Sequence, residues 1–203
     1  MCSSDLAFLL LSGAAVLPAQ TAEVHPSLLF EAADIPTLKE RVQRGPYSGW
    51  WSTVLSRANN IPSTFSSERD KARWAKSLAF AYVLTDSAHY AAQAASILAD
   101  VKFPPRGGDL GEPHIEGEAV AHYAEAYDML HGWLTANDAA ALDTIRTILA
   151  EEAHRLYDGI EIKIGTGIFS LNFALHETPH IDNWHLRAYG GLGLAALAMR
   201  DHQ

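Results

Sequence analysis

Apolar residues recur along this chain at the three- and four-residue intervals of an amphipathic helix, and strand-like alternation is scarce. One of the clearest stripes consists of Trp74, Leu78 and Tyr82, and it predicts a helix that Ser66 or Ser67 caps. Acidic residues in the first turn of that helix suit its positive N-terminal end. The hydrophobic pattern therefore predicts an all-α protein.

The same periodicity predicts a succession of helices separated by short breaks. Besides the helix capped near residue 66, we expect helices over 33–44, 47–58, 88–101 and 115–134, one that ends near 157, and one that starts near 183. Prolines and glycines predict loops over 103–114 and 160–182. No fixed repeat is visible, so we expect paired antiparallel helices that do not repeat in sequence.

Two of these helices have especially continuous apolar faces. The helix over 115–134 aligns Val120, Tyr123, Ala124, Tyr127 and Leu130, and the next aligns Leu142, Ile145, Leu149, Ala153 and Leu156. Between them, Thr135 and Asp138 resemble a capping box with Asp in place of the usual Glu. We expect these two faces to form much of the core.

The N-terminal residues resemble a secretory signal peptide. Residues 7–17 are an apolar run, and the small and polar residues 18–22 follow, with cleavage expected after Ala19 or Ala22. The usual positive region is missing, and we interpret residues 1–6 as an artefact joined to a truncated signal peptide. The expected location is secreted or periplasmic, with no membrane association in the mature form. No run reaches the roughly 18–20 apolar residues of a membrane span.

The C-terminal residues predict a helix that stops in mid-course. Residues 192–199 are apolar, and the chain ends four residues later without a capping glycine. We therefore interpret 23–203 as the N-terminal part of a longer secreted protein.

Composition and charge exclude several classes of function. The 203 residues are 48% hydrophobic and 19% charged, as in an ordinary globular protein. A net charge of −9 disfavours a general nucleic-acid binder, which needs a basic face. The single cysteine cannot form an internal disulfide or a cysteine-based zinc site. We predict no metal and no cofactor.

Residues 176–180 spell H-E-x-x-H, the zinc-protease spacing. That motif needs both histidines on one face of a helix, but Pro179 stands inside it. Proline removes a helical hydrogen bond and pushes Thr178 towards extended geometry. A loop carrying two histidines is the better interpretation.

Acidic residues gather near the start of the helix over 115–134. Glu118, His122 and Glu125 share one face, which indicates a solvated or cleft-facing polar stripe more readily than a metal site. Glu112, Glu116 and Glu118 could also supply the acid or base of a glycosidase.

The segment 180–191 is the most informative part of the chain. It gathers several polar and aromatic residues around one predicted helix start: His180, Asn183, Trp184, His185, Arg187 and Tyr189. One interpretation is a functional site. The other is a polar N-cap followed by a core helix whose glycines permit close packing, and the residue types alone leave both open.

Three motifs in order resemble the heparinase II/III-like polysaccharide lyases and related alginate lyases. They are the opening His25-Pro26-Ser27-Leu28-Leu29-Phe30 with Asp34-Ile35-Pro36-Thr37-Leu38-Lys39, the "AYDxL" stretch Ala126-Tyr127-Asp128-Met129-Leu130, and Asn183-Trp184 followed by the Gly190-Gly191 helix. The resemblance spans residues 25 to 200. It implies an incomplete (α/α) toroid built from antiparallel helical hairpins, truncated at the C-terminus, with a β-sandwich domain following in full-length members.

The resemblance also implies β-elimination at a uronic acid. Such an enzyme neutralises the substrate carboxylate with hydrogen-bond donors and removes the proton on C5. Asn183 best matches the family's neutralising residue, with His185 second. His180, Trp184, Arg187 and Tyr189 are assigned to substrate binding by proximity. The family's catalytic tyrosine and a further histidine lie beyond Gln203, so we expect the isolated chain to be inactive.

The expected partner is an anionic polysaccharide of alginate or glycosaminoglycan type. Arg106, Lys163 and Arg187 could line a basic groove, but the acidic balance of the chain favours a modestly charged uronate polymer over a densely sulfated one. Two alternatives stay open: an α/α-barrel glycoside hydrolase, and a non-catalytic helical carbohydrate-binding module.

Overall fold

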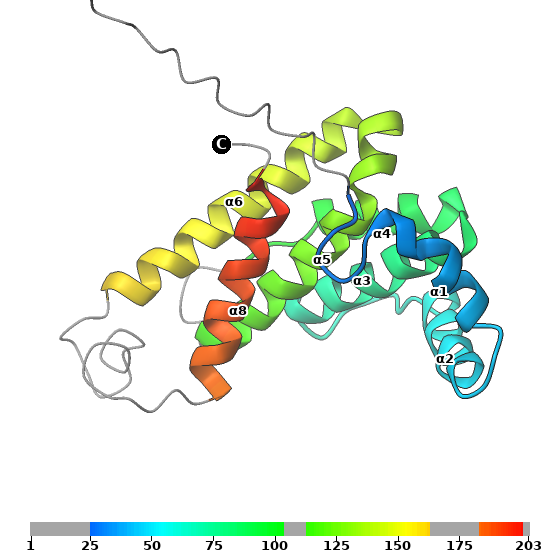
Figure 1. Ribbon diagram of the computed structural model, residues 1–203. Coiled ribbons are helices and arrows are strands. Elements are labelled where there is room, and N and C mark those ends of the chain that lie inside the picture. Colours follow the sequence, from blue (N-terminus) through cyan, green and yellow to red (C-terminus); the bar gives the residue numbers. More distant parts are fainter. Residues whose placement is uncertain (1–24, 104–112, 163–182, 201–203) are drawn as a thin grey trace, which may run out of the picture.

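Helices carry all the regular structure in the residues that the computed structural model describes, which are 25–103, 113–162 and 183–200. The all-α class predicted from the sequence is confirmed for these residues (Figure 1). The elements are η1 (Ala32–Asp34), α1 (Ile35–Arg41), α2 (Tyr47–Asn59), α3 (Glu68–Thr85), α4 (Ala88–Ala99), α5 (Pro113–Asn137), α6 (Ala139–Ile162) and α8 (Asn183–Ala198).

Local signals fix where α3 begins and ends. Ser67 is the N-cap, and its side chain accepts a hydrogen bond from the backbone N–H of Asp70 at 3.1 Å. At the other end Asp86 adopts a left-handed conformation with φ of 57°, which turns the chain into α4 after only two residues. The predicted break at Gly45-Pro46 is also confirmed, since α2 begins at Tyr47.

Helix α5 supplies the centre of the core. The predicted face of Val120, Tyr123, Ala124, Tyr127 and Leu130 is fully buried. The Tyr123 hydroxyl lies 3.1 Å from the carbonyl oxygen of Leu98 in α4 and 3.2 Å from that of Ile145 in α6. Burial raises the pKa of Tyr123, so this hydroxyl stays protonated and ties three helices together.

Several predicted boundaries were wrong. The first helix is split into η1 and α1, and it ends at Arg41 instead of residue 44. Pro113 and His114 were assigned to a loop but open α5, since proline is tolerated in the first turn of a helix, where its missing N–H has no partner to lose. Residues 160–162 were assigned to an irregular stretch but close α6.

The predicted cap between α5 and α6 also needs correction. Thr135 lies inside α5, where its hydroxyl donates to the carbonyl oxygen of His131 at 2.8 Å. Asp138 itself caps α6 by accepting the backbone N–H of Ala141 at 3.0 Å. Asp is among the preferred N-cap residues, and the short linker leaves no room for a cap three residues earlier.

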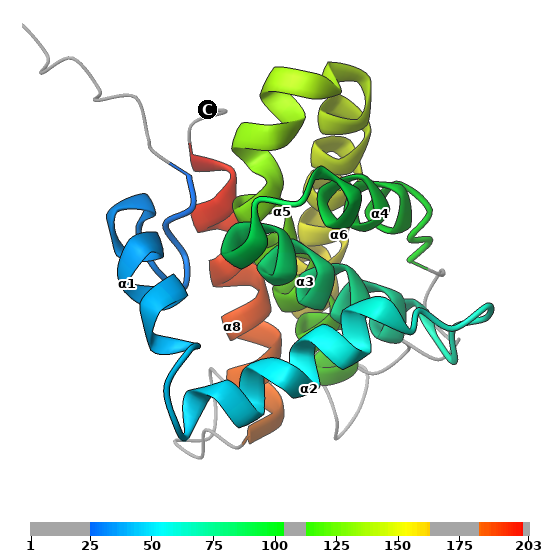
Figure 2. The same ribbon diagram turned by 90° about the vertical axis from the view of Figure 1, so that its right-hand side faces the viewer.

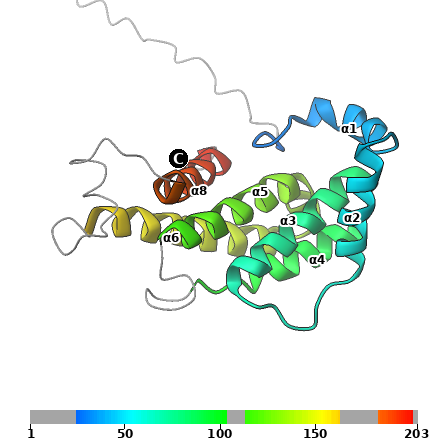
Figure 3. The same ribbon diagram turned by 90° about the horizontal axis from the view of Figure 1, so that it is seen from below.

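Helix α8 packs lengthwise against α5 (Figures 1 and 2). Seen from below, α8 and α1 lie on the same side of the layer formed by α3, α4, α5 and α6 (Figure 3). The α5–α8 contact is made by backbone at Gly117 and Gly191. A Cβ on Gly117 would lie 2.5 Å from the Cα of Ala188, and one on Gly191 would collide with the Gly117 carbonyl. Glycine is therefore required at both positions.

The segment that precedes α1 is held on α5 by Asp128. This carboxylate accepts the backbone N–H groups of Ser27 at 2.9 Å and Leu28 at 3.0 Å, and lies 2.6 Å from Nδ1 of His25. Arg200, just after α8, reaches the Ser27 hydroxyl at 3.3 Å. Parts of two of the motifs that carry the lyase resemblance thus touch each other, although about a hundred residues separate them.

Within the described residues, no helix has both the length and the apolar composition that crossing a bilayer requires.

Candidate functional site

The residues singled out in segment 180–191 fall in the first half of α8, except His180, which lies outside the described residues. Asn183, Trp184 and His185 occupy the first turn of α8. Tyr189 is partly buried against the hydrophobic core. Arg187 is exposed, and its guanidinium group contacts Glu118 of α5. This contact identifies a candidate site between the two helices.

Arg187 shares the carboxylate of Glu118 with two arginines of α3. Glu118 lies 3.4 Å from Arg187, 3.3 Å from Arg69 and 3.4 Å from Arg73. Two helices, α3 and α8, therefore bring three guanidinium groups to one carboxylate of α5, and that carboxylate is itself only 25% exposed. Each guanidinium keeps further N–H donors for other partners, because one carboxylate cannot saturate three of them.

The polar stripe predicted on α5 continues this site. His122 lies 3.6 Å from Glu118 and 3.5 Å from Glu125, and Glu125 lies 2.5 Å from Lys76 of α3. The stripe faces the cations of α3. We call Arg69, Arg73, Lys76 and Arg187 together the basic cluster.

The cations keep both carboxylates ionised. Burial alone would raise the pKa of Glu118, but the charges of Arg69, His122, Arg187 and Arg73 outweigh it and lower that pKa. The pKa of Glu125 is likewise lowered, since its bonds to His122 and Lys76 outweigh its burial. Four cations against two carboxylates leave an excess of two positive charges, in a chain whose net charge is −9.

Sequence reasoning named only Arg187 among these cations. Arg106 and Lys163, the other two candidates for a basic groove, lie outside the described residues. Arg69, Arg73 and Lys76 were missed because they lie more than 40 residues before Glu118, and the sequence does not show that the two helices are neighbours. A partial signal was present, since the cations recur at intervals of four and three residues and the two acids of α5, Glu118 and Glu125, are also seven residues apart.

A second group of charges is buried between α5 and α6. Arg155 lies 2.7 Å from Glu116 and 2.5 Å from Glu152, and these acidic residues are 1% and 3% exposed. Burial raises the pKa of Glu152 to about 7, and the neighbouring Glu116 adds to this against the opposing charge of Arg155. Glu116 is thus engaged in a buried ion pair and is not free to act on a glycoside.

No group of three His, Cys, Asp or Glu side chains suited to holding a metal ion occurs within 25–103, 113–162 and 183–200. The H-E-x-x-H sequence at 176–180 falls outside those ranges. Glu118, once a conceivable ligand, is occupied by guanidinium groups instead.

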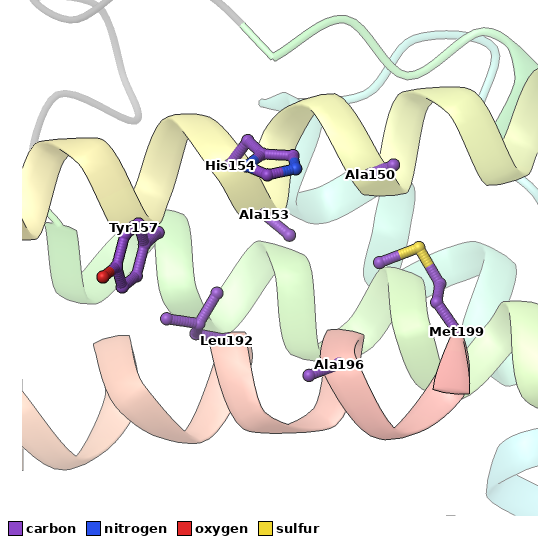
Figure 4. A pocket seen from close by; sticks show the side chains of 7 residues that line it. All are labelled: Ala150, Ala153, His154, Tyr157, Leu192, Ala196 and Met199. Atoms are coloured by element: carbon purple, nitrogen blue, oxygen red, sulfur yellow. The ribbon is translucent and has the colours of Figure 1, made fainter. Parts of the chain in front are cut away.

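An open cavity of about 310 Å³ lies between α6 and α8 (Figure 4). Small and apolar side chains dominate its lining, which consists of Ala150, Ala153, His154, Tyr157, Leu192, Ala196 and Met199. Leu192 and Ala196 follow Arg187 by five and nine residues, which places them on the opposite face of α8. The cavity is therefore separate from the basic cluster, and its lining contains no lysine or arginine.

Comparison with known proteins adds no assignment: no family model matches the chain, and no curated protein matches it.

Proposed function

We propose that this chain is part of a secreted lyase that cleaves uronic-acid-containing polysaccharide by β-elimination. The observation that carries the proposal is the meeting of Arg187 with Arg69 and Arg73 around Glu118, because it places excess positive charge beside the first half of α8. The motif resemblance drew attention to that same half of α8. An acidic protein that concentrates cations at one place is suited to an anionic ligand there.

The chemistry of β-elimination explains why such charge would be useful. The proton on C5 is only weakly acidic while the adjacent carboxylate is ionised, so donors that neutralise the carboxylate lower the barrier. In this proposal Asn183 and His185 act at the reacting sugar. Arg187, two residues after His185, draws the substrate carboxylate towards the first turn of α8, because the N-terminal end of a helix favours anions. The chain is then one portion of an incomplete (α/α) toroid.

The glycoside hydrolase alternative is less well supported by the same geometry. A glycosidase needs a carboxylic acid with a raised pKa placed to protonate the leaving oxygen. The pKa of Glu118 is lowered by its cations, and Glu116 is buried against Arg155. The non-catalytic carbohydrate-binding module remains an outcome of the test below.

The test is to express the protein from its own gene, including any sequence that follows Gln203, and to incubate it with alginate, heparan and chondroitin. A lyase releases unsaturated ends, so ultraviolet absorbance should rise with at least one of these polymers. Asn183→Ala should lower that rate by about a hundredfold or more, the usual effect of removing a transition-state donor.

A control variant, Asn137→Ala at the end of α5, should keep the full rate. New reducing ends without ultraviolet absorbance would favour the hydrolase. Binding without any cleavage would favour the module, and either result would refute the lyase.

A further inference from the structure

The three cations that α3 contributes to the basic cluster form a straight row. Arg69, Arg73 and Lys76 are separated by four and three residues, so they lie on one face of the helix. At 1.5 Å per residue the row spans about 10 Å. Their side chains are 32%, 39% and 30% exposed, so each side chain is partly accessible to solvent.

The acidic residues of α5 run beside this row in the same order. Glu118 meets the first two cations, and Glu125, about two helical turns after Glu118, meets Lys76. These carboxylates are 25% and 9% exposed, which is less than the cations they contact. The anions thus lie beneath and the cations lie outside, so the carboxylates hold the cations in place without covering them.

We propose that Arg69, Arg73 and Lys76, continued by Arg187, bind acidic groups on successive sugars of one chain. The ligand is then an oligomer of uronic acid and not a single acidic sugar, a specificity that rests on the proposed function for the identity of the acidic groups. Guanidinium groups suit carboxylates because they offer two parallel donors. A row of cations is matched by a polymer that carries a carboxylate on every sugar.

Nucleic acid fits the row less well. A protein that binds duplex DNA electrostatically makes on the order of 6–10 phosphate contacts, whereas this cluster has an excess of only two positive charges. The net charge of −9 on the whole chain opposes a densely charged partner further. An oligosaccharide with one carboxylate on each sugar is charged less densely than duplex DNA and is the better match.

The experiment measures equilibrium binding of oligomannuronates of two and four sugars by calorimetry. The full chain carries Asn183→Ala, so that the oligosaccharides are not consumed. The tetramer should bind about tenfold more tightly than the dimer, because it engages additional cations. Raising the salt concentration should reduce that advantage, because the head groups are partly exposed and the Debye length shortens.

Variants locate the binding to the row. Arg73→Gln and Lys76→Gln should each weaken tetramer binding about fivefold to tenfold, as expected for a partly exposed charged hydrogen bond. Binding of the two-sugar oligomannuronate should weaken by a smaller factor. Arg44→Gln and Lys102→Gln are matched controls, since these cations are exposed and lie outside the cluster, and they should leave binding unchanged. Circular dichroism and melting temperature confirm that each variant is folded.

Four results would overturn the inference. They are equal affinity for dimer and tetramer, equal binding of neutral cellotetraose, tighter binding of single-stranded DNA than of the tetramer, and unchanged affinity in Arg73→Gln. Failure of the lyase proposal is a different result, namely no unsaturated product from the unsubstituted protein. A row-dependent preference for the tetramer without any product would uphold the binding row and refute the lyase.

Discussion

Two buried carboxyl groups, those of Glu116 and Glu152, share the single guanidinium of Arg155. One positive charge cannot offset two negative charges and the loss of hydration of both. The raised pKa of Glu152 shows how the protein meets this cost, since the group takes up a proton well above the pH at which a solvated glutamate would. A single residue thereby makes the stability of the fold depend on pH.

The sign of that dependence follows from the two pKa values of Glu152. The folded value, about 7, lies above the usual value of 4.5, so folding takes up a proton between them. The stabilising contribution of Glu152 to the free energy of unfolding is fully present below pH 4.5 and is lost as pH rises through 7. We expect Glu152→Gln, which cannot ionise, to gain stability relative to the unsubstituted protein between pH 5 and 8, by on the order of 1–3 kcal/mol.

Melting temperatures recorded across that pH range measure the effect. The neighbouring Glu151→Gln, at an exposed position, is the matched control and should follow the unsubstituted protein. Parallel curves for Glu152→Gln and the unsubstituted protein would contradict the prediction.

Among the elements, α5 and α8 show what sequence periodicity can and cannot reveal. The buried face of α5 was predicted residue by residue, because burial of an apolar stripe depends only on spacing within one helix. The packing of α8 against α5 was not predictable. The contact between Gly117 and Gly191 depends on how the surfaces of two helices fit together, and these glycines are 74 residues apart in the sequence. One interpretation of segment 180–191, a helix whose glycines permit close packing, applies at Gly191. It does not apply at Gly190 or Gly193.

That difference gives a matched pair of substitutions in α8. Gly191→Ala forces a methyl group onto the Gly117 carbonyl and should cost about 1–3 kcal/mol or more, because backbone cannot move aside as a side chain can. Gly193→Ala meets nothing within 4 Å and should stabilise the helix by up to about 1 kcal/mol. Urea unfolding measures both midpoints. Equal midpoints for the two variants would mean that α5 and α8 do not touch there.

At the scale of the whole molecule, Asp128 joins the beginning of the described chain to its centre. Its carboxylate is almost fully buried and holds two backbone N–H groups and His25. The sequence marked both partners as motifs, but one sequence carries no signal that such motifs touch. For the same reason the cations of α3 were missed: opposite charges on separate helices become a site only when the fold brings the helices together.

Asp128→Ala should therefore release the segment before α1 and cost about 2–4 kcal/mol, because it leaves polar groups without their partner. Hydrogen exchange at the amides of Ser27 and Leu28 should accelerate. Asp143→Ala removes an exposed ion pair with Arg146 and should change stability by less than about 0.5 kcal/mol. Unchanged protection of the two amides in Asp128→Ala would show that another contact holds the segment.

The position of Glu118 among three arginines has a consequence for selectivity. The Glu118 carboxylate acts as a tethered ligand of the three arginines and is always present at a high local concentration. An anion from solution must therefore bind the arginines more favourably than Glu118 already does. Acetate or chloride would replace the single charge of Glu118 with another single charge, so its net binding free energy is small. An oligomer of acidic sugars offers several carboxylates at once. Under the proposed binding of an acidic polymer, the internal carboxylate sets a threshold of affinity that a singly charged anion does not reach.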